Sequence, residues 1–208
     1  MVSFTGTMAK LANLSDQAGS RTPPNPAMPS FAIVMKVGPH SGMTLAEILE
    51  TKHEEETVHG VHYWGYSGTA CHPRRVIEFI RYVRAFQSMP PVLMLLETSS
   101  KYSSRIGKAR SYSVHGGESH GLEEPIQLQG AQYAFVCVNL QRRDLEFSLD
   151  SYSVVGGKND GVPLGEHLRS RVSKAFVRRK YVQSTSHVVR LAYTVELVEP
   201  YVISLGVA

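Results

Sequence analysis

The chain has 208 residues, of which 42% are hydrophobic and 19% are charged, and its net charge is +4. This balance excludes an intrinsically disordered chain and is typical of a globular domain. The longest run of aliphatic residues and Met, residues 92–96, is far shorter than the roughly 20 residues that cross a bilayer. The N-terminus has no apolar signal segment. Both features favour a cytoplasmic protein without a membrane partner.

The N-terminal thirty residues are predicted to be a flexible, disordered arm, because four prolines occur within residues 23–29. Residues 31–208 are expected to form a single domain. Residues 31–37 (FAIVMKV) are a nearly continuous apolar run, which predicts a strand covered on both faces. Thr44, followed three residues later by Glu47, has the pattern of a capping box and predicts the start of a short helix.

A second, amphipathic helix is predicted from Pro73 to about Gln87, and residues 92–97 read as the next buried strand. Further strands are expected at 108–114, 132–140, 145–155 and 188–198, separated by Gly-rich turns, with a helix over 164–177. The sequence thus predicts an α+β domain with two to three helices and a mixed or largely antiparallel sheet, with closure into a barrel as an alternative.

Residues 59–75 (HGVHYWGYSGTACHPRR) hold the only Trp and one of the two Cys, directly before the Pro73 helix. The first-turn amides of a helix lack internal partners and favour an anion. Small and hydroxyl residues, arginines and aromatic rings surround this position, a combination that suits the phosphate and the base of a nucleotide. The predicted ligand-binding residues are Tyr63, Trp64, Tyr66, Ser67, Thr69, Arg74 and Arg75.

The same segment allows other interpretations. Cys71 near a helix N-terminus is a candidate nucleophile with His62 or His72 as its base, and these histidines are the candidate acid-base groups if the protein is a phosphoester hydrolase or transferase. His53 and His59 have no HExxH spacing, so a divalent metal is chemically conceivable but unsupported, and we predict no metal site or other cofactor. In the structural alternative, Tyr63 and Trp64 are core residues.

The basic character of the chain lies in its C-terminal part, because residues 161–208 hold seven Lys and Arg against three Asp and Glu, a difference that equals the net charge of +4. A nucleic-acid-binding module is therefore one alternative function, and an interaction scaffold without a pocket is another. We expect a phosphorylated small molecule, foremost a nucleotide, as the ligand. The nucleic-acid alternative depends on Arg169, Arg171, Lys174, Arg178, Arg179 and Lys180.

Overall fold

The computed structural model describes residues 28–40, 42–97, 112–115, 118–121, 128, 131–169, 173–180 and 188–205. Residues 1–27 of the predicted arm lie outside the described residues. The helices are α2 (Leu45–His59), α3 (Pro73–Phe86) and α4 (Leu164–Leu168), with short 3-10 helices η1 (Leu149–Ser151) and η2 (Gly157–Asn159). The strands are β1 (Phe31–Val37), β2 (His62–Tyr66), β3 (Val92–Glu97), β4 (Tyr112–His115), β5 (Glu118–Gly121), β6 (Tyr133–Ser148), β7 (Tyr152–Val154), β8 (Lys174–Arg179) and β9 (Val188–Leu205).

All described strands belong to one sheet, whose main path has the order β2-β6-β9-β3-β1-β8-β7. The pair of β1 and β3 is parallel, and the other neighbours on this path are antiparallel. The predicted α+β domain with a mixed sheet is confirmed. Within the described part of the chain β2 and β7 are the ends of the path, so the sheet is open and the barrel alternative is not realised.

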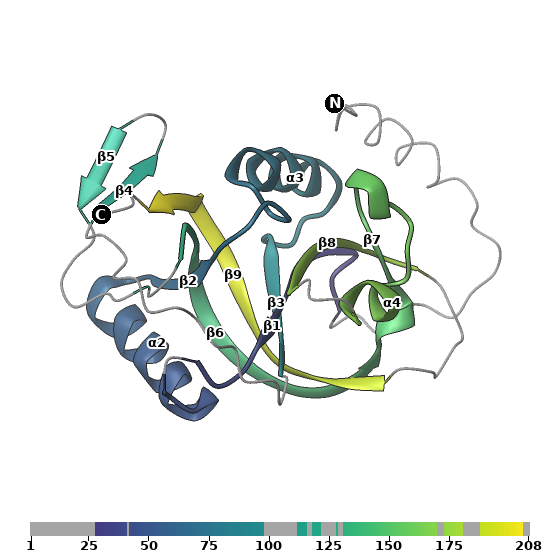
Figure 1. Cartoon of the computed structure of the whole chain (residues 1–208), viewed down its shortest axis with the longest axis horizontal. Helices are drawn as coiled ribbons and strands as arrows, with labels where there is room; N and C mark the ends of the chain where they lie inside the picture. Colours follow the sequence, from purple (N-terminus) through teal and green to yellow (C-terminus); the bar gives the residue numbers. More distant parts are fainter. Residues whose placement is uncertain are drawn as a thin grey trace.

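Strand β1 runs through the middle of the protein and is covered on both faces, as its apolar sequence predicts. Ile33 contributes to the cluster of buried residues beneath α3, whereas Ala32 and Val34 belong to a second cluster with α4 and η1. Because successive strand residues point to opposite faces, a strand between two such clusters must be apolar throughout. Figure 1 shows α3 above the middle of the sheet, α4 beside β7 and β8, and α2 at the other end near β2.

Helix α3 packs against the sheet with the side that its 3.6-residue periodicity predicts, and its start at Pro73 confirms the sequence assignment. The ring of Phe79 stacks on that of Phe176 of β8, with 4.7 Å between the ring centroids. Both rings are almost fully buried. The contact fixes the first half of α3 over β8, and this relation positions the candidate site described below.

Helix α2 begins as predicted, because Thr44 and Glu47 form both hydrogen bonds of the capping box. The backbone N–H of Thr44 donates to the Glu47 carboxylate at 2.7 Å, and the Thr44 hydroxyl accepts from the Glu47 N–H at 3.3 Å. Gly60 ends the helix at φ 74°, a left-handed conformation that Gly adopts without a steric cost. These local signals need no tertiary context, which is why the sequence identifies the helix.

The expectation of two separate strands at 132–140 and 145–155 is wrong. Strand β6 continues from Tyr133 to Ser148 beside β9, and Figure 1 shows both as long, curved strands. Register shifts after Val138 absorb the polar residues that resemble a turn, and Asn139 takes a φ of 58° there. The chain then passes through η1 into the short β7.

The predicted helix over 164–177 begins at the correct residue but is too long, since α4 ends at Leu168 and residues 174–179 form β8. Pairing of β8 with both β1 and β7 satisfies its backbone groups in a sheet interior, and this tertiary context overrides the helical spacing of the apolar residues. The segment 62–66, which we interpreted as part of a loop, is β2 on the edge of the sheet.

Replacement of Phe79 by Ala tests the packing of α3. We expect the free energy of unfolding to fall by about 3 to 5 kcal/mol, because the change leaves a cavity against Phe176. Phe86 on the same helix is 58% exposed and provides the matched control, for which Phe86→Ala should change the stability by well under about 1 kcal/mol. Urea denaturation followed by circular dichroism measures both, and equal effects would contradict the assigned helix orientation.

Candidate functional site

The aromatic segment before α3 is built into the core rather than opened toward solvent. His62, Trp64 and Tyr66 alternate along β2 and are all buried, as expected for a strand with one inward face. Trp64 is only 5% exposed, and the Tyr66 ring stacks on Phe135 with 4.3 Å between centroids. Neither ring therefore presents a surface for a nucleotide base, which corrects the expected role of both residues.

Two other expected ligand residues also make internal contacts. Tyr63, on the opposite side of β2, is half-buried against a third apolar cluster, and its N–H donates to the Glu55 carboxylate at 3.2 Å. The Ser67 hydroxyl accepts a hydrogen bond from the Gln132 N–H at 3.2 Å. These contacts hold the end of β2 and the following turn in place. They give a structural reason for the residue types found here.

The proposed nucleophile is inaccessible. Cys71 is completely buried, and burial raises the pKa of its thiol to about 12, although Lys174 and Arg75 act in the opposite direction. A reactive cysteine requires a lowered pKa and some exposure, so the Cys71 hypothesis is corrected. Its candidate base His62 is also fully buried, whereas His72 is exposed and makes an edge contact with the Tyr133 ring at 5.7 Å.

The backbone amides at the start of α3 are less available than the sequence suggests. Pro73 has no N–H, and the N–H groups of Arg75 and Val76 both donate to the His72 carbonyl, at 2.8 and 3.1 Å. Of the following side chains, Arg74 is exposed and pairs with Glu78 at 3.1 Å. Positive charge at this helix end must therefore come mainly from side chains, and the emphasis on free amides is corrected.

A cavity of about 270 Å³ lies where the turn after β2, the start of α3 and the segment 154–159 meet. Two of the expected ligand residues, Thr69 and Arg75, line it. The other basic residues of the lining, Lys158 and Lys174, lie far from this helix start in the sequence. The complete lining is Thr69, Ala70, Arg75, Val154, Val155, Gly156, Gly157, Lys158, Asn159, His167, Lys174, Ala175 and Phe176.

The wall of the cavity opposite α3 is a glycine turn, which contains Gly156 and Gly157. Gly156 and Gly157 have φ values of 81° and 72°, which favour glycine, and the Gly156 N–H donates to the Asp160 carboxylate at 2.8 Å. A guanidinium nitrogen of Arg75 lies 3.6 Å from where a Cβ atom of Gly157 would stand. The turn therefore brings its peptide backbone close to Arg75, while the Asp160 carboxylate binds within the turn.

Lys174 supplies a buried cation to the cavity. The residue is 5% exposed, and its Nζ donates to the Ser67 carbonyl at 2.7 Å and lies 5.1 Å from the centre of the Tyr66 ring. Among the described residues no carboxylate forms an ion pair with it. Burial lowers the pKa of this amine, and the neighbouring Cys71 has the smaller, opposite effect. A buried amine in a cavity is costly to keep charged without an anion.

His167 completes the polar lining from α4. Its Nδ1 lies 3.2 Å from Asn159 Nδ2, and because an amide nitrogen only donates, Nδ1 accepts and the ring proton belongs on Nε2. Burial lowers the pKa of His167, and a hydrogen bond to the Lys174 backbone opposes this effect. At neutral pH the imidazole is therefore a neutral polar group.

The basic segment of the nucleic-acid alternative is divided among several environments. Lys174 lies in the cavity, while Arg179 donates to the Met28 carbonyl at 3.3 Å and Lys180 to the Gly161 carbonyl at 3.0 Å. Arg178 and Arg179 are consecutive strand residues and so point to opposite faces. Arg169 is exposed beyond α4, and Arg171 lies outside the described residues.

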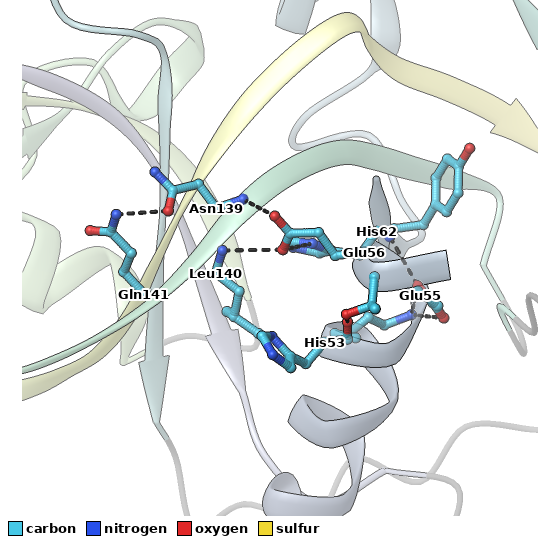
Figure 2. A network of polar contacts seen from close by, with 10 residues as sticks. His53, Glu55, Glu56, His62, Asn139, Leu140 and Gln141 are labelled. Atoms are coloured by element: carbon cyan, nitrogen blue, oxygen red, sulfur yellow. Dashed lines mark hydrogen bonds and ion pairs between the residues drawn. The ribbon is translucent and has the colours of Figure 1, made fainter. Parts of the chain in front are cut away.

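A separate polar cluster joins α2 to the bulge of β6 (Figure 2). The Glu56 carboxylate accepts the N–H of Asn139 at 2.6 Å and that of Leu140 at 3.4 Å, and it lies 3.1 Å from His62 Nδ1. Burial alone would raise the pKa of Glu56, but these hydrogen bonds and the nearby His62 lower it overall. The arrangement ties the strained Asn139 to α2, which is a structural role.

His62 itself is held neutral at this position. Burial lowers its pKa to about 4, with smaller contributions in the same direction from Lys52 and His53, while Glu56 opposes the shift. Its Nε2 is buried and has no hydrogen-bond partner among the described residues. His62 is not among the residues that line the cavity, and we therefore assign it to the stability of the fold and not to acid-base chemistry.

A comparison with known protein families finds no family model that matches this chain, and comparisons with curated proteins and with solved structures find no similar chain. In the part of the chain that the structure describes, no helix is long and apolar enough to span a membrane. Within the same residues no three His, Cys, Asp or Glu side chains converge to hold a metal ion.

The buried His62 predicts a loss of stability in acid. Since its folded pKa of about 4 lies below the ordinary 6.5, the unfolded chain binds more protons between these values, and stability falls as the pH decreases through this window. The loss should be about 3 kcal/mol, at roughly 1.4 kcal/mol per pKa unit. Glu56, whose pKa is also lowered, adds to the loss at still lower pH.

Urea denaturation at several pH values, followed by fluorescence of the single Trp, measures this loss. His62→Gln should reduce the dependence between pH 6.5 and about 4, because one titrating group is gone while His167, whose pKa burial also lowers, remains. His72→Gln, which removes an exposed histidine, serves as the control and should leave the dependence as in the wild type. Parallel curves for the wild type and His62→Gln would rule out the assigned environment of His62.

Proposed function

We propose that the chain binds a phosphorylated small molecule in the cavity between α3, the glycine turn and β8. The observation that carries this proposal is the charge of the lining. Arg75 and Lys158 contribute positive charge, Lys174 adds a buried amine, and none of the described residues that line the cavity is Asp or Glu. A concave site with several cations and no internal carboxylate stabilises an anionic guest.

The size and shape of the cavity favour a compact ligand. A volume of about 270 Å³ lies just below the range of roughly 300 to 1,000 Å³ that drug-sized ligands occupy. The aromatic ring in the lining, Phe176, has one neighbour in Phe79 and another in the Arg75 guanidinium, which lies 5.6 Å from its centre. A phosphate ester of a small alcohol or sugar therefore fits this proposal better than a nucleotide, whose base would need a free ring to stack on.

Each polar residue described below has a role in the proposed binding of the phosphate. Arg75 offers N–H donors in the planar arrangement that a phosphate accepts, and Lys158 follows the glycine turn as a second cation. Thr69 and Asn159 supply uncharged donors at the rim. Lys174 adds a buried amine to the lining.

Isothermal titration calorimetry with glycerol 3-phosphate tests this function. Arg75→Gln should raise the dissociation constant about tenfold or more, because a charge-assisted hydrogen bond is worth at least about 1.5 kcal/mol. Arg74→Gln is the matched control, since Arg74 is the adjacent residue but is exposed and pairs with Glu78. It should bind like the wild type.

Glycerol, which lacks the phosphate, should show no binding in the same experiment. An equal loss of affinity in both arginine variants would place the anion outside the cavity. The absence of any heat with glycerol 3-phosphate or inorganic phosphate, under conditions where the protein is folded, would refute the proposed function.

A further inference from the structure

We propose that Lys174 attaches covalently to its ligand, forming an imine with a small aldehyde that carries a phosphate group. This inference rests on the proposed function, because the phosphate is the group that the cavity holds. It adds a reactive role to the site and names the class of substrate.

The first argument is the environment of the amine. Lys174 is 5% exposed, lines the cavity, and has as its polar partner the Ser67 carbonyl at 2.7 Å. The other buried lysine, Lys52, is 7% exposed, and both Glu55 oxygens accept from its Nζ at 2.6 and 2.8 Å. Burial lowers the pKa of both amines, but the Glu55 carboxylate opposes this effect at Lys52, whereas no carboxylate among the described residues pairs with Lys174.

The second argument is the arrangement of charges around that amine. Arg75 and Lys158 line the same cavity and are the groups on which a phosphate would be held. Desolvation is a known means of making a lysine nucleophilic near neutral pH. Burial lowers the pKa of Lys174.

The third argument is that the thiol near the cavity is blocked. Cys71 is fully buried, its carbonyl accepts the Tyr66 hydroxyl at 2.7 Å, and the pKa of its thiol is raised. An electrophile in the cavity therefore meets the amine and not a thiolate. Among the described residues that line the cavity, Lys174 is the buried group with a lone pair suited to carbonyl addition.

The proposed step balances without an added oxidant or reductant. The neutral Nζ of Lys174 attacks the aldehyde carbon and forms the C–N bond, while the carbonyl π electrons move to oxygen. A proton passes from nitrogen to that oxygen, giving a carbinolamine. Loss of one water molecule, formed from this hydroxyl group and the second amine proton, leaves the C=N double bond.

Reduction of the imine tests the proposal on the full chain. The protein is incubated with glycolaldehyde phosphate, sodium borohydride is added, and the adduct is located by peptide mass spectrometry. Hydride adds to the imine carbon and a solvent proton to nitrogen, so the product is a stable secondary amine. We expect a single modified site at Lys174, and at least tenfold less total label in Lys174→Met.

Lys52→Met is the control, because it removes a buried lysine outside the cavity and should leave labelling of Lys174 unchanged if the protein folds. Mapping of the wild type gives the position of the adduct even if Lys174→Met does not fold. Label spread over exposed lysines, with Lys174 unmodified, overturns the proposal. Equal labelling by glycolaldehyde without phosphate also overturns it, because the phosphate then does not direct the reaction.

Failure of this inference can be separated from failure of the proposed function. If glycerol 3-phosphate binds in an Arg75-dependent manner but no adduct forms at Lys174, the covalent step is wrong and the anion site stands. If neither binding nor labelling occurs, both are wrong. Binding of glycerol 3-phosphate, labelling of Lys174 and competition between the two ligands support both.

Discussion

The contact between Lys174 and the Ser67 carbonyl is the interaction on which the candidate site depends. It joins the first residue of β8 to the turn after β2, two segments that are 107 residues apart in the sequence. The amine lies beneath Tyr66 and next to Cys71, both of which are buried. The cavity forms beside this contact because the glycine turn approaches Arg75 from the other side.

The rigid part of this arrangement is the centre of the sheet. Strands β1, β3 and β8 are covered by apolar clusters on both faces, and α3 is fixed by the stacked pair of Phe79 and Phe176. Interiors of this density do not deform easily, so the side chains of β8 have defined positions. The loops that complete the cavity contribute polar groups to its lining, while β8 determines the position of the buried Lys174 amine.

Local signals in the sequence predict a large part of the fold. The capping box at Thr44, the periodicity after Pro73 and the apolar run of β1 each identify their element, because each depends on neighbouring residues. Signals that depend on distant partners mislead. The sequence predicts that a helix continues through residue 177, but residues 174–179 form a strand that pairs with β1 and β7. It predicts two strands at 132–140 and 145–155, but β6 continues through the bulge at Asn139.

In the candidate site, too, local signals identify part of the cavity lining, whereas proximity between distant segments is not visible in the sequence. The sequence identifies the start of α3 as a position for an anion, and Thr69 and Arg75 do line the cavity. It assigns the aromatic residues to the ligand, although the alternation of His62, Trp64 and Tyr66 indicates a strand with a buried face. Lys158, His167 and Lys174 come from segments whose proximity only the sheet order reveals. The sequence places Lys174 with the basic residues of the nucleic-acid alternative.

The most direct test of the central claim is the pKa of the Lys174 side chain, measured by NMR from the pH dependence of its ¹³Cε shift. Loss of this signal in Lys174→Met assigns it. We predict a midpoint below the ordinary lysine value of 10.5, since burial disfavours the charged amine. A midpoint at or above that value would show a solvated or ion-paired amine and would contradict the account.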